Sequence, residues 1–217
     1  MSHITLIRHG QANTHARDEE EYDRLSTLGH QQSGWLGEHL RQSASHHTRL
    51  YTGTLLRHRE TAASMALETD LIEDARLNEL EYFNLARLME EQHGLPFPTE
   101  REDFVAHLPQ IFTAWKAGKL EGTAETFADF ETRVAEALHD IAIGDGPALV
   151  VTSGGVIAIA LRRMMELNIA STARIALAIM NTSMHRLFPI GAQLSPVLFN
   201  AVPHLDIPDR HFAQTHF

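Results

Sequence analysis

An apolar run that ends in small and polar residues occurs twice in this sequence and constrains its fold more than any other feature. Residues Ala148–Thr152 form the clearest such run, which stops at Ser153-Gly154-Gly155 and is followed by a helical pattern over roughly 156–167. Residues Ile4–Ile7 have the same character and stop at Arg8-His9-Gly10. A short, mostly β-branched apolar run bounded in this way indicates a buried strand. Both strands are therefore expected inside a sheet that other elements cover.

Helical and strand patterns alternate along most of the remaining chain. Ser26 is a suitable N-cap for the first predicted helix, because serine accepts hydrogen bonds from the free N–H groups of a first turn. This alternation predicts an α/β fold, namely a three-layer α/β/α sandwich with a mainly parallel central sheet, in a single domain over residues 1–217. Further helices are predicted over roughly 26–43, 55–68 and 126–143, and further strands over 49–52, 184–189 and 194–199.

Two segments do not fit the alternation. Residues 83–122 combine a helical pattern with Pro96, Pro98, Gly118 and Gly122, which interrupt regular structure. They are predicted to form a small helical insertion that caps the core sheet. Residues 16–24 are polar and rich in acidic side chains, and a loop is predicted there.

Composition excludes several classes of function. The chain has 217 residues, a formal net charge of −10 and no cysteine. The absence of cysteine excludes a disulfide framework and a cysteine nucleophile, and the negative charge argues against nucleic acid or an anionic membrane as a partner. The fifteen histidines show no paired metal-ligand spacing, so no metal is expected. No apolar run is long enough for a membrane span and no secretory signal is recognisable, so a cytoplasmic protein is expected.

The ends of the predicted strands carry residues that suit an oxyanion, and ligand sites of open α/β sheets lie at such ends. Arg8 offers planar, permanently charged donors that match phosphate oxygens in pairs. His9 is a nitrogen nucleophile near neutral pH, and Gly10 beside it allows the backbone to approach an anion. Arg57 lies near a predicted helix start, where free N–H groups attract negative charge.

Two further segments could complete a phosphate site. Gly154, which follows Ser153 at a strand end, frees backbone N–H groups toward an anion. Cleavage of a phosphate ester needs a proton for the leaving oxygen, and Glu79 is the candidate donor. Each segment alone has a plainer interpretation: a turn with surface charges, a solvated helix, an acidic loop or, at Ser153, a helix N-cap. Their common position at strand ends favours the site.

Taken in order and spacing, these segments resemble the histidine phosphatase superfamily, also called the phosphoglycerate mutase-like family. The resemblance covers nearly the whole chain. The matching segments are Leu6-Ile7-Arg8-His9-Gly10, the helix start over residues 25–32, Arg57 with Thr61-Ala62, Leu77-Asn78-Glu79, Asn200, and His204-Leu205.

The resemblance implies a role for each site residue. His9 would attack phosphorus and hold the phosphoryl group, while Arg8 and Arg57 would bind its oxygens. Glu79 would protonate the leaving alcohol and then activate water. Neither a metal nor an organic cofactor is implied.

The sequence departs from the family pattern at Ser153-Gly154, where histidine and glycine are usual. Serine cannot carry the positive charge of a histidine, and charge-assisted hydrogen bonds are roughly twice as strong as neutral ones. Three outcomes are open: Ser153 and the helix N-terminus suffice, another histidine such as His58 or His185 supplies the charge, or the protein binds phosphate but turns over poorly. Gly53-Thr54, where serine and proline are usual, is a smaller departure.

The function expected first is hydrolysis of phosphate monoesters through a phosphohistidine on His9. The alternative is a catalytically weakened phospholigand-binding or regulatory protein on the same fold. A phosphoglycerate mutase is less expected, because a mutase must exclude water from its phosphoenzyme and the insertion is short. The substrate could be a phosphorylated small molecule or a phosphoprotein, and residues 11–24 and 83–122 are expected to select it. The sequence does not indicate the oligomeric state.

Overall fold

The computed structural model describes residues 1–43 and 46–216, and in that part of the chain six strands form one sheet in the order β3-β2-β4-β1-β5-β6. The strands are β1 (Ile4–Arg8), β2 (Arg49–Thr52), β3 (Leu71–Glu73), β4 (Ala148–Thr152), β5 (Met184–Ile190) and β6 (Gln193–Ala201). β1 to β4 pair in parallel, whereas β5 and β6 extend the sheet antiparallel beside β1. The predicted α/β fold is confirmed, with a mixed sheet.

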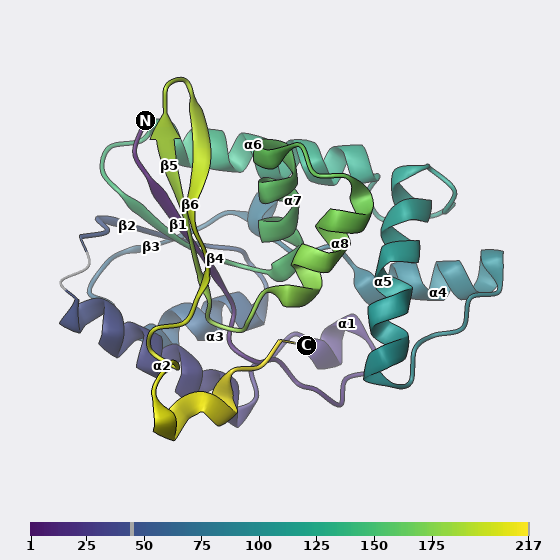
Figure 1. The fold of residues 1–217 in the computed structure, drawn as a ribbon, viewed down its shortest axis with the longest axis horizontal. Helices are drawn as coiled ribbons and strands as arrows, with labels where there is room; N and C mark the ends of the chain where they lie inside the picture. Colours follow the sequence, from purple (N-terminus) through teal and green to yellow (C-terminus); the bar gives the residue numbers. More distant parts are fainter. Residues whose placement is uncertain (44–45, 217) are drawn as a thin grey trace.

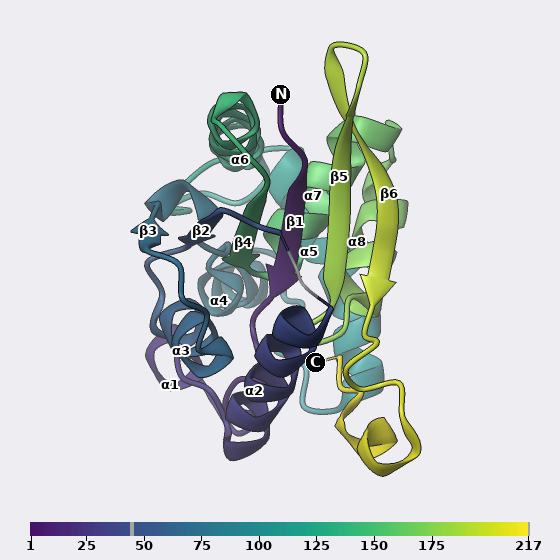
Figure 2. The same ribbon diagram turned by 90° about the vertical axis from the view of Figure 1, so that its left-hand side faces the viewer.

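Helices cover both faces of this sheet (Figures 1 and 2). The helices are α1 (Glu19–Tyr22), α2 (Thr27–Gln42), α3 (Leu56–Met65), α4 (Tyr82–His93), α5 (Arg101–Lys116), α6 (Phe127–Ile143), α7 (Gly154–Met165) and α8 (Ile169–Ala178). Side chains of α2 and α3 pack on one face, and those of α6 and α7 pack on the other. α8 packs against α7, α5 against α8, and α4 against α5. Within the described residues, no helix is both long enough and apolar enough to cross a bilayer.

The central strands bury both of their faces. Ile4 and Leu6 of β1 join the hydrophobic cluster on the side of α6 and α7, whereas Ile7 joins the cluster on the side of α2 and α3. β4 divides its side chains between the two clusters in the same way. Successive side chains of a strand point to opposite faces, so a strand covered on both sides has no polar alternation. This explains the continuous apolar runs in the sequence.

The predicted element boundaries hold best where a capping residue marks them. Ser26 caps α2 as predicted, since its hydroxyl accepts a hydrogen bond from the Gly29 N–H at 3.0 Å. The loop predicted over residues 16–24 contains the four-residue helix α1, whose N-terminus is capped by the Asp18 carboxylate. β3 and α8 were not predicted. β3 is an edge strand with no buried side chain, and its three residues are too few to show a strand pattern in the sequence.

The segment predicted as an insertion contains α4 and α5, with Pro96 and Pro98 between them. Leu85, Phe112 and Trp115 from this segment are buried in the same cluster as β1 and β4. The two helices are therefore part of the main hydrophobic core and also extend beyond the sheet (Figure 1).

The sheet also buries a histidine whose protonation couples folding to pH. His185 lies in β5 opposite Leu6, and its Nε2 lies 2.8 Å from the Ser183 hydroxyl oxygen. Burial lowers the pKa of His185 to about 3, and the charge of Arg8 acts in the same direction. An unfolded histidine binds a proton near pH 6.5. Below that pH the unfolded state therefore takes up the proton first, and stability falls as the pH falls.

We therefore expect the titration of His185 to lower the free energy of unfolding by about 1 kcal/mol as the pH falls from about 7 to 5.5. The change His185→Gln should remove this part of the pH dependence, because glutamine does not titrate. The matched change His139→Gln, at an exposed position, should leave it intact. Urea unfolding of the three proteins at both pH values measures the difference. An identical pH dependence in all three would contradict this account.

Candidate active site

The carboxyl ends of three parallel strands meet at one edge of the sheet. β1 pairs with β4 so that Arg8 lies opposite Thr152, and β2 pairs with β4 so that Thr52 lies opposite Val151. The pairing continues beyond β1, because the His9 N–H donates to the Thr152 carbonyl at 2.9 Å. The carboxyl ends of β1, β2 and β4 are therefore neighbours in space.

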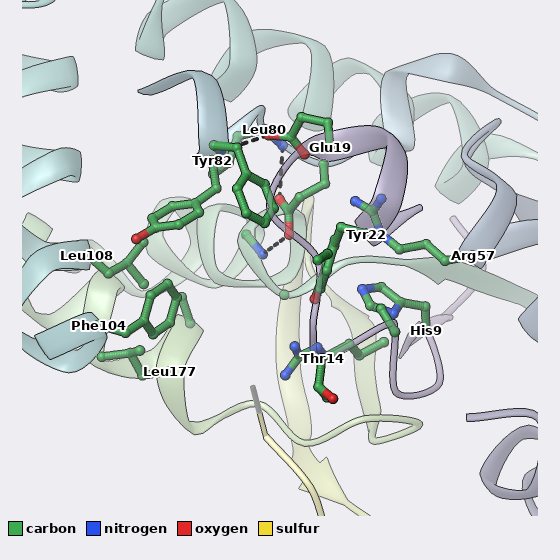
Figure 3. Close-up of a pocket in the computed structure, with 18 of the residues that line it drawn as sticks. His9, Thr14, Glu19, Tyr22, Arg57, Leu80, Tyr82, Phe104, Leu108 and Leu177 are labelled. Atoms are coloured by element: carbon green, nitrogen blue, oxygen red, sulfur yellow. Dashed lines mark hydrogen bonds between the residues drawn. The ribbon is translucent and has the colours of Figure 1, made fainter. Parts of the chain in front are cut away.

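A cavity of about 360 Å³ opens at this edge, and five of the six predicted site residues line it: Arg8, His9, Arg57, Glu79 and Gly154. Ser153, the sixth, has a fully buried side chain and is not among the lining residues. Figure 3 shows the side chains of His9 and Arg57 together at one end of this cavity. Folding thus brings together an imidazole and a guanidinium group that are far apart in the sequence.

His9 is held in the form that a nucleophile requires. Its Nδ1 lies 2.7 Å from the Gly10 carbonyl oxygen. A carbonyl oxygen only accepts hydrogen bonds, so Nδ1 carries the proton and Nε2 keeps its lone pair. Burial lowers the pKa of His9 well below its ordinary 6.5, and the charges of Arg57 and Arg8 lower it further. His9 is therefore a neutral imidazole at neutral pH.

Gly10 serves packing, and the expectation that it lets the backbone approach an anion is wrong. A Cβ atom at Gly10 would lie 2.4 Å from the Gly29 carbonyl oxygen in α2. The Gly10 N–H donates to the Thr61 hydroxyl at 3.0 Å. Both contacts fix the turn after His9 between α2 and α3.

Arg57 reaches the cavity from the first turn of α3 and is 2% exposed. Its Nη1 donates to Asp23 Oδ1 at 3.0 Å, and its guanidinium carbon lies 5.0 Å from the centre of the Tyr22 ring. The Asp23 carboxylate also accepts hydrogen bonds from the N–H groups of Leu56 and Arg57. The expectation that free N–H groups at this helix start bind the anion is therefore wrong, because a carboxylate of the chain occupies them.

Arg8 is held by main-chain carbonyls. Its Nη1 donates to the carbonyl oxygens of Ile179 and His216, so the C-terminal segment helps to fix the guanidinium group. The Nε–H groups of Arg8 and Arg57 have no hydrogen-bond acceptor among the described residues. A buried donor without an acceptor costs about 1–3 kcal/mol. Each arginine thus has one buried donor whose partner is not found in the described part of the chain.

Two carboxyl groups line the cavity beside these cations. Glu79 Oε1 accepts a hydrogen bond from the Leu80 N–H at 3.0 Å, and Oε2 accepts one from the Gly155 N–H at 2.9 Å. Glu19 was not identified from the sequence. Its Oε1 accepts a hydrogen bond from the Phe83 N–H at 2.8 Å, and burial raises the pKa of Glu19 to about 7. Glu19 lies in an acidic stretch, so no sequence signal distinguishes it from its neighbours.

The Ser153 hydroxyl is hydrogen-bonded to a histidine. Ser153 Oγ lies 2.6 Å from His58 Nε2, and both side chains are 0% exposed. Ser153 makes no side-chain capping bond to α7, so the N-cap interpretation does not account for its hydroxyl group. The His58 ring lies 5.7 Å from the His9 ring, centre to centre. A Cβ atom at Gly53 would lie 2.3 Å from His58 Nδ1, so glycine at this position leaves the space that His58 occupies.

His58 is neutral in this environment. Burial lowers its pKa well below 6.5, and the charge of Arg57 lowers it further. His58 Nδ1 has no hydrogen-bond partner among the described residues. A proton on Nδ1 would be a buried donor without an acceptor, so the tautomer protonated at Nε2 is favoured. In that tautomer Nε2–H donates to Ser153, whose own hydroxyl proton stays available for another acceptor.

His185 does not occupy an equivalent place. Its Nε2 is bonded to the Ser183 hydroxyl group, its Nδ1 accepts the Asn200 N–H at 3.3 Å, and it does not line the cavity. Of the two histidines considered as replacements for the family histidine, His58 is the one that contacts Ser153.

The C-terminal residues of the resemblance support the site from outside. Asn200 Oδ1 accepts the Met180 N–H at 2.8 Å, and His204 Nε2 lies 2.8 Å from the Thr182 hydroxyl oxygen. Between these two contacts, the Asn181 side chain lines the cavity and donates to the His9 carbonyl oxygen at 3.2 Å. Asn200 and His204 thus fix the segment that supports His9.

Comparisons with solved structures find the same fold. An Entamoeba histolytica phosphoserine phosphatase mutant in complex with phosphoserine has a TM-score of 0.69 and 16% identity, covering 94% of this chain and 100% of that chain. Bacillus stearothermophilus YhfR has a TM-score of 0.69 and 19% identity, covering 94% and 99%. A mycobacterial glucosyl-3-phosphoglycerate phosphatase with inorganic phosphate has a TM-score of 0.67 and 20% identity, covering 95% and 100%.

The sequence itself gives a family match. It matches none of the curated proteins, whereas the family model of the histidine phosphatase superfamily (branch 1) matches residues 4–201. This match runs from the first residue of β1 to the last residue of β6. The chain therefore belongs to the histidine phosphatase superfamily.

Proposed function

We propose that this protein hydrolyses phosphate monoesters through a phosphohistidine on His9. The observation that supports this most directly is the state of His9, which is neutral, keeps the lone pair of Nε2 and lies near the buried Arg8 and Arg57. A protonated imidazole would have no lone pair for the attack on phosphorus. The positive charges of Arg8 and Arg57 both lower the pKa of His9 and attract the phosphate group.

The first step forms the phosphoenzyme. His9 Nε2 attacks phosphorus, the bond from phosphorus to the ester oxygen breaks, and Glu79 gives a proton to the leaving alcohol. Arg8, Arg57 and the Gly154 N–H at the start of α7 bind the phosphoryl oxygens, on which negative charge is concentrated in the transition state. The N–H groups of Leu80 and Gly155 donate to the Glu79 carboxyl group and hold it beside the leaving oxygen.

The second step returns His9 to its neutral form. Glu79, now a carboxylate, takes a proton from water while the water oxygen attacks the phosphohistidine. The bond from phosphorus to Nε2 breaks, inorganic phosphate leaves, and Glu79 is again protonated. The proton that Glu79 gave to the alcohol is thereby replaced from water.

Ser153 and His58 together take the place of the usual family histidine. In the favoured tautomer His58 donates to Ser153, which leaves the serine hydroxyl proton free to bond to a phosphoryl oxygen. This arrangement supplies a hydrogen bond but no positive charge, because His58 is neutral. It favours the outcome in which Ser153 and the helix N-terminus suffice, with His58 as a positioning residue.

The neutral pair also defines the second candidate function, a phospholigand-binding protein with weak turnover. Without the charge of a second histidine, phosphate binding can persist while the phosphoryl transfer step slows. A panel of phosphate monoesters separates the two candidates. Turnover above about 1 s⁻¹ for at least one ester is in the range of ordinary enzymes and favours the phosphatase, whereas binding without turnover favours the second candidate.

Replacing the nucleophile should abolish formation of the phosphoenzyme. We expect His9→Ala to lose kcat by at least about 10³-fold and to show no labelled protein after mixing with a ³²P-phosphate ester and quenching in alkali, which preserves phosphohistidine. The matched change His139→Ala, at an exposed histidine, should label like the wild type. Equal labelling of His9→Ala and the wild type would exclude His9 as the phosphoryl acceptor.

Removing the serine hydroxyl should slow catalysis more than it weakens binding. We expect Ser153→Ala to lower kcat about 10- to 100-fold, the value of one hydrogen bond to a charged group, with a smaller change in KM. His58→Ala should lower kcat in the same direction and by less, because Ser153 remains but is no longer oriented.

The double variant His58→Ala/Ser153→His tests the exchange directly. Without the His58 ring there is space for a histidine at position 153, and its charge-assisted hydrogen bond should restore kcat to at least the wild-type value. The single variant Ser153→His should be destabilised, because two buried rings would compete for one space. Wild-type kcat in both Ser153→Ala and His58→Ala would show that the pair has no part in catalysis.

A further inference from the structure

The two ends of the cavity differ in chemistry. Figure 3 shows His9 and Arg57 at one end and, across the cavity, Tyr82, Phe104 and Leu177 at the other. The aromatic residues at the far end come from α4, from α5 and from the segment between them. The part of the cavity that would hold the leaving group of a phosphate ester is therefore an aromatic and aliphatic surface.

The aromatic side chains form one connected cluster. The rings of Tyr82 and Phe104 meet edge to face with centres 5.1 Å apart, and those of Phe83 and Phe97 stack with centres 5.8 Å apart. The Tyr82 hydroxyl is hydrogen-bonded to His107 Nδ1 at 3.0 Å. Because this contact engages the hydroxyl group, the Tyr82 ring is the part that the cavity can use. This aromatic wall, formed by Tyr82, Phe83, Phe97 and Phe104, favours flat apolar groups. An apolar group has no hydrogen bonds to water that it would lose on binding there.

The charged residues that line the cavity also favour an uncharged leaving group. Among the described residues that line it, the arginines are Arg8 and Arg57, and no lysine is present. Both arginines lie at the His9 end and are assigned to the phosphoryl group. Glu19 and Glu79 also line the cavity, and Figure 3 shows Glu19 between the two ends. An ester whose alcohol part carries a carboxylate would thus meet two carboxyl groups and no cation.

We propose that the substrate class is the phosphate monoesters of uncharged, apolar alcohols, in particular arylalkyl alcohols whose ring packs against Tyr82 and Phe104. This inference rests on the proposed phosphatase function and specifies which esters the same site accepts. Leu108 and Leu177 complete the surface with aliphatic contacts, which match an apolar group better than a quaternary ammonium group. A cavity of about 360 Å³ lies within the range of small-molecule sites.

The test compares esters whose leaving alcohols are all primary alkyl alcohols, so that leaving-group reactivity contributes little. Benzyl phosphate is compared with phosphoserine, 3-carboxypropyl phosphate and phosphocholine. We expect kcat/KM for benzyl phosphate to exceed that of each of the others by at least about tenfold, given the apolar area that the ring buries. A value for a carboxylate ester or for phosphocholine that equals or exceeds the value for benzyl phosphate would overturn the assigned class.

A variant at Phe104 tests whether the aromatic side chains cause the preference for benzyl phosphate. Phe104→Ala should lower kcat/KM for benzyl phosphate about tenfold and change that for phosphoserine less than about twofold. Phe188→Ala, which removes an aromatic ring that is 46% exposed in β5, should leave both values unchanged. An equal loss for both esters in Phe104→Ala would mean that the ring supports the fold and does not select the substrate.

Failure of the substrate class and failure of the phosphatase function give different results. If benzyl phosphate is poor but another ester labels His9 and turns over, only the assigned class is wrong. If none of the four esters labels His9 or turns over, the phosphatase function fails, and the substrate class fails with it.

Discussion

The pairing of β1 with β4 is the contact on which the site depends. It places Arg8 opposite Thr152, so the residues that follow both strands leave the sheet at the same edge. The His9 N–H donates to the Thr152 carbonyl oxygen at the end of β4. α7 begins at Gly154, two residues after Thr152. A shift of the register by one residue would turn every side chain of β1 to the opposite face. The burial of both faces of β1 and β4 fixes this register, and thereby the position of His9.

Burial of charged and titratable groups gives the site its chemical properties. Arg57 is paired with Asp23, and Arg8 is bonded to two main-chain carbonyl oxygens. These partners offset part of the cost of removing the guanidinium groups from water. His9 has the Gly10 carbonyl oxygen as a partner, but burial and the charges of Arg57 and Arg8 outweigh this contact, and both His9 and His58 stay neutral. The arginines keep their charge because a guanidinium group does not deprotonate in proteins, whereas low exposure keeps the two imidazoles neutral.

Two departures from the family pattern become one arrangement in the folded protein. Gly53 and Ser153 are separate differences along the chain, yet the His58 ring fills the space beside Gly53 and bonds to Ser153. Sequence inspection offered His58 and His185 as equal candidates for the missing histidine. The choice between them depends on which ring reaches residue 153, and that distance is a property of the packing of α3 against β4.

Local patterns in the sequence were enough to predict the α/β class, the strands and helices with strong apolar periodicity, and the position of the candidate phosphate-site residues at strand ends. These features depend on local patterns and on the rule that parallel strands end at a common edge. The sequence did not predict the occupation of the α3 N-terminus by Asp23, the raised pKa of Glu19 or the aromatic contact between Tyr82 and Phe104. The folded chain was needed to find these three features, because each depends on contacts between residues distant in sequence and on the burial that such contacts produce.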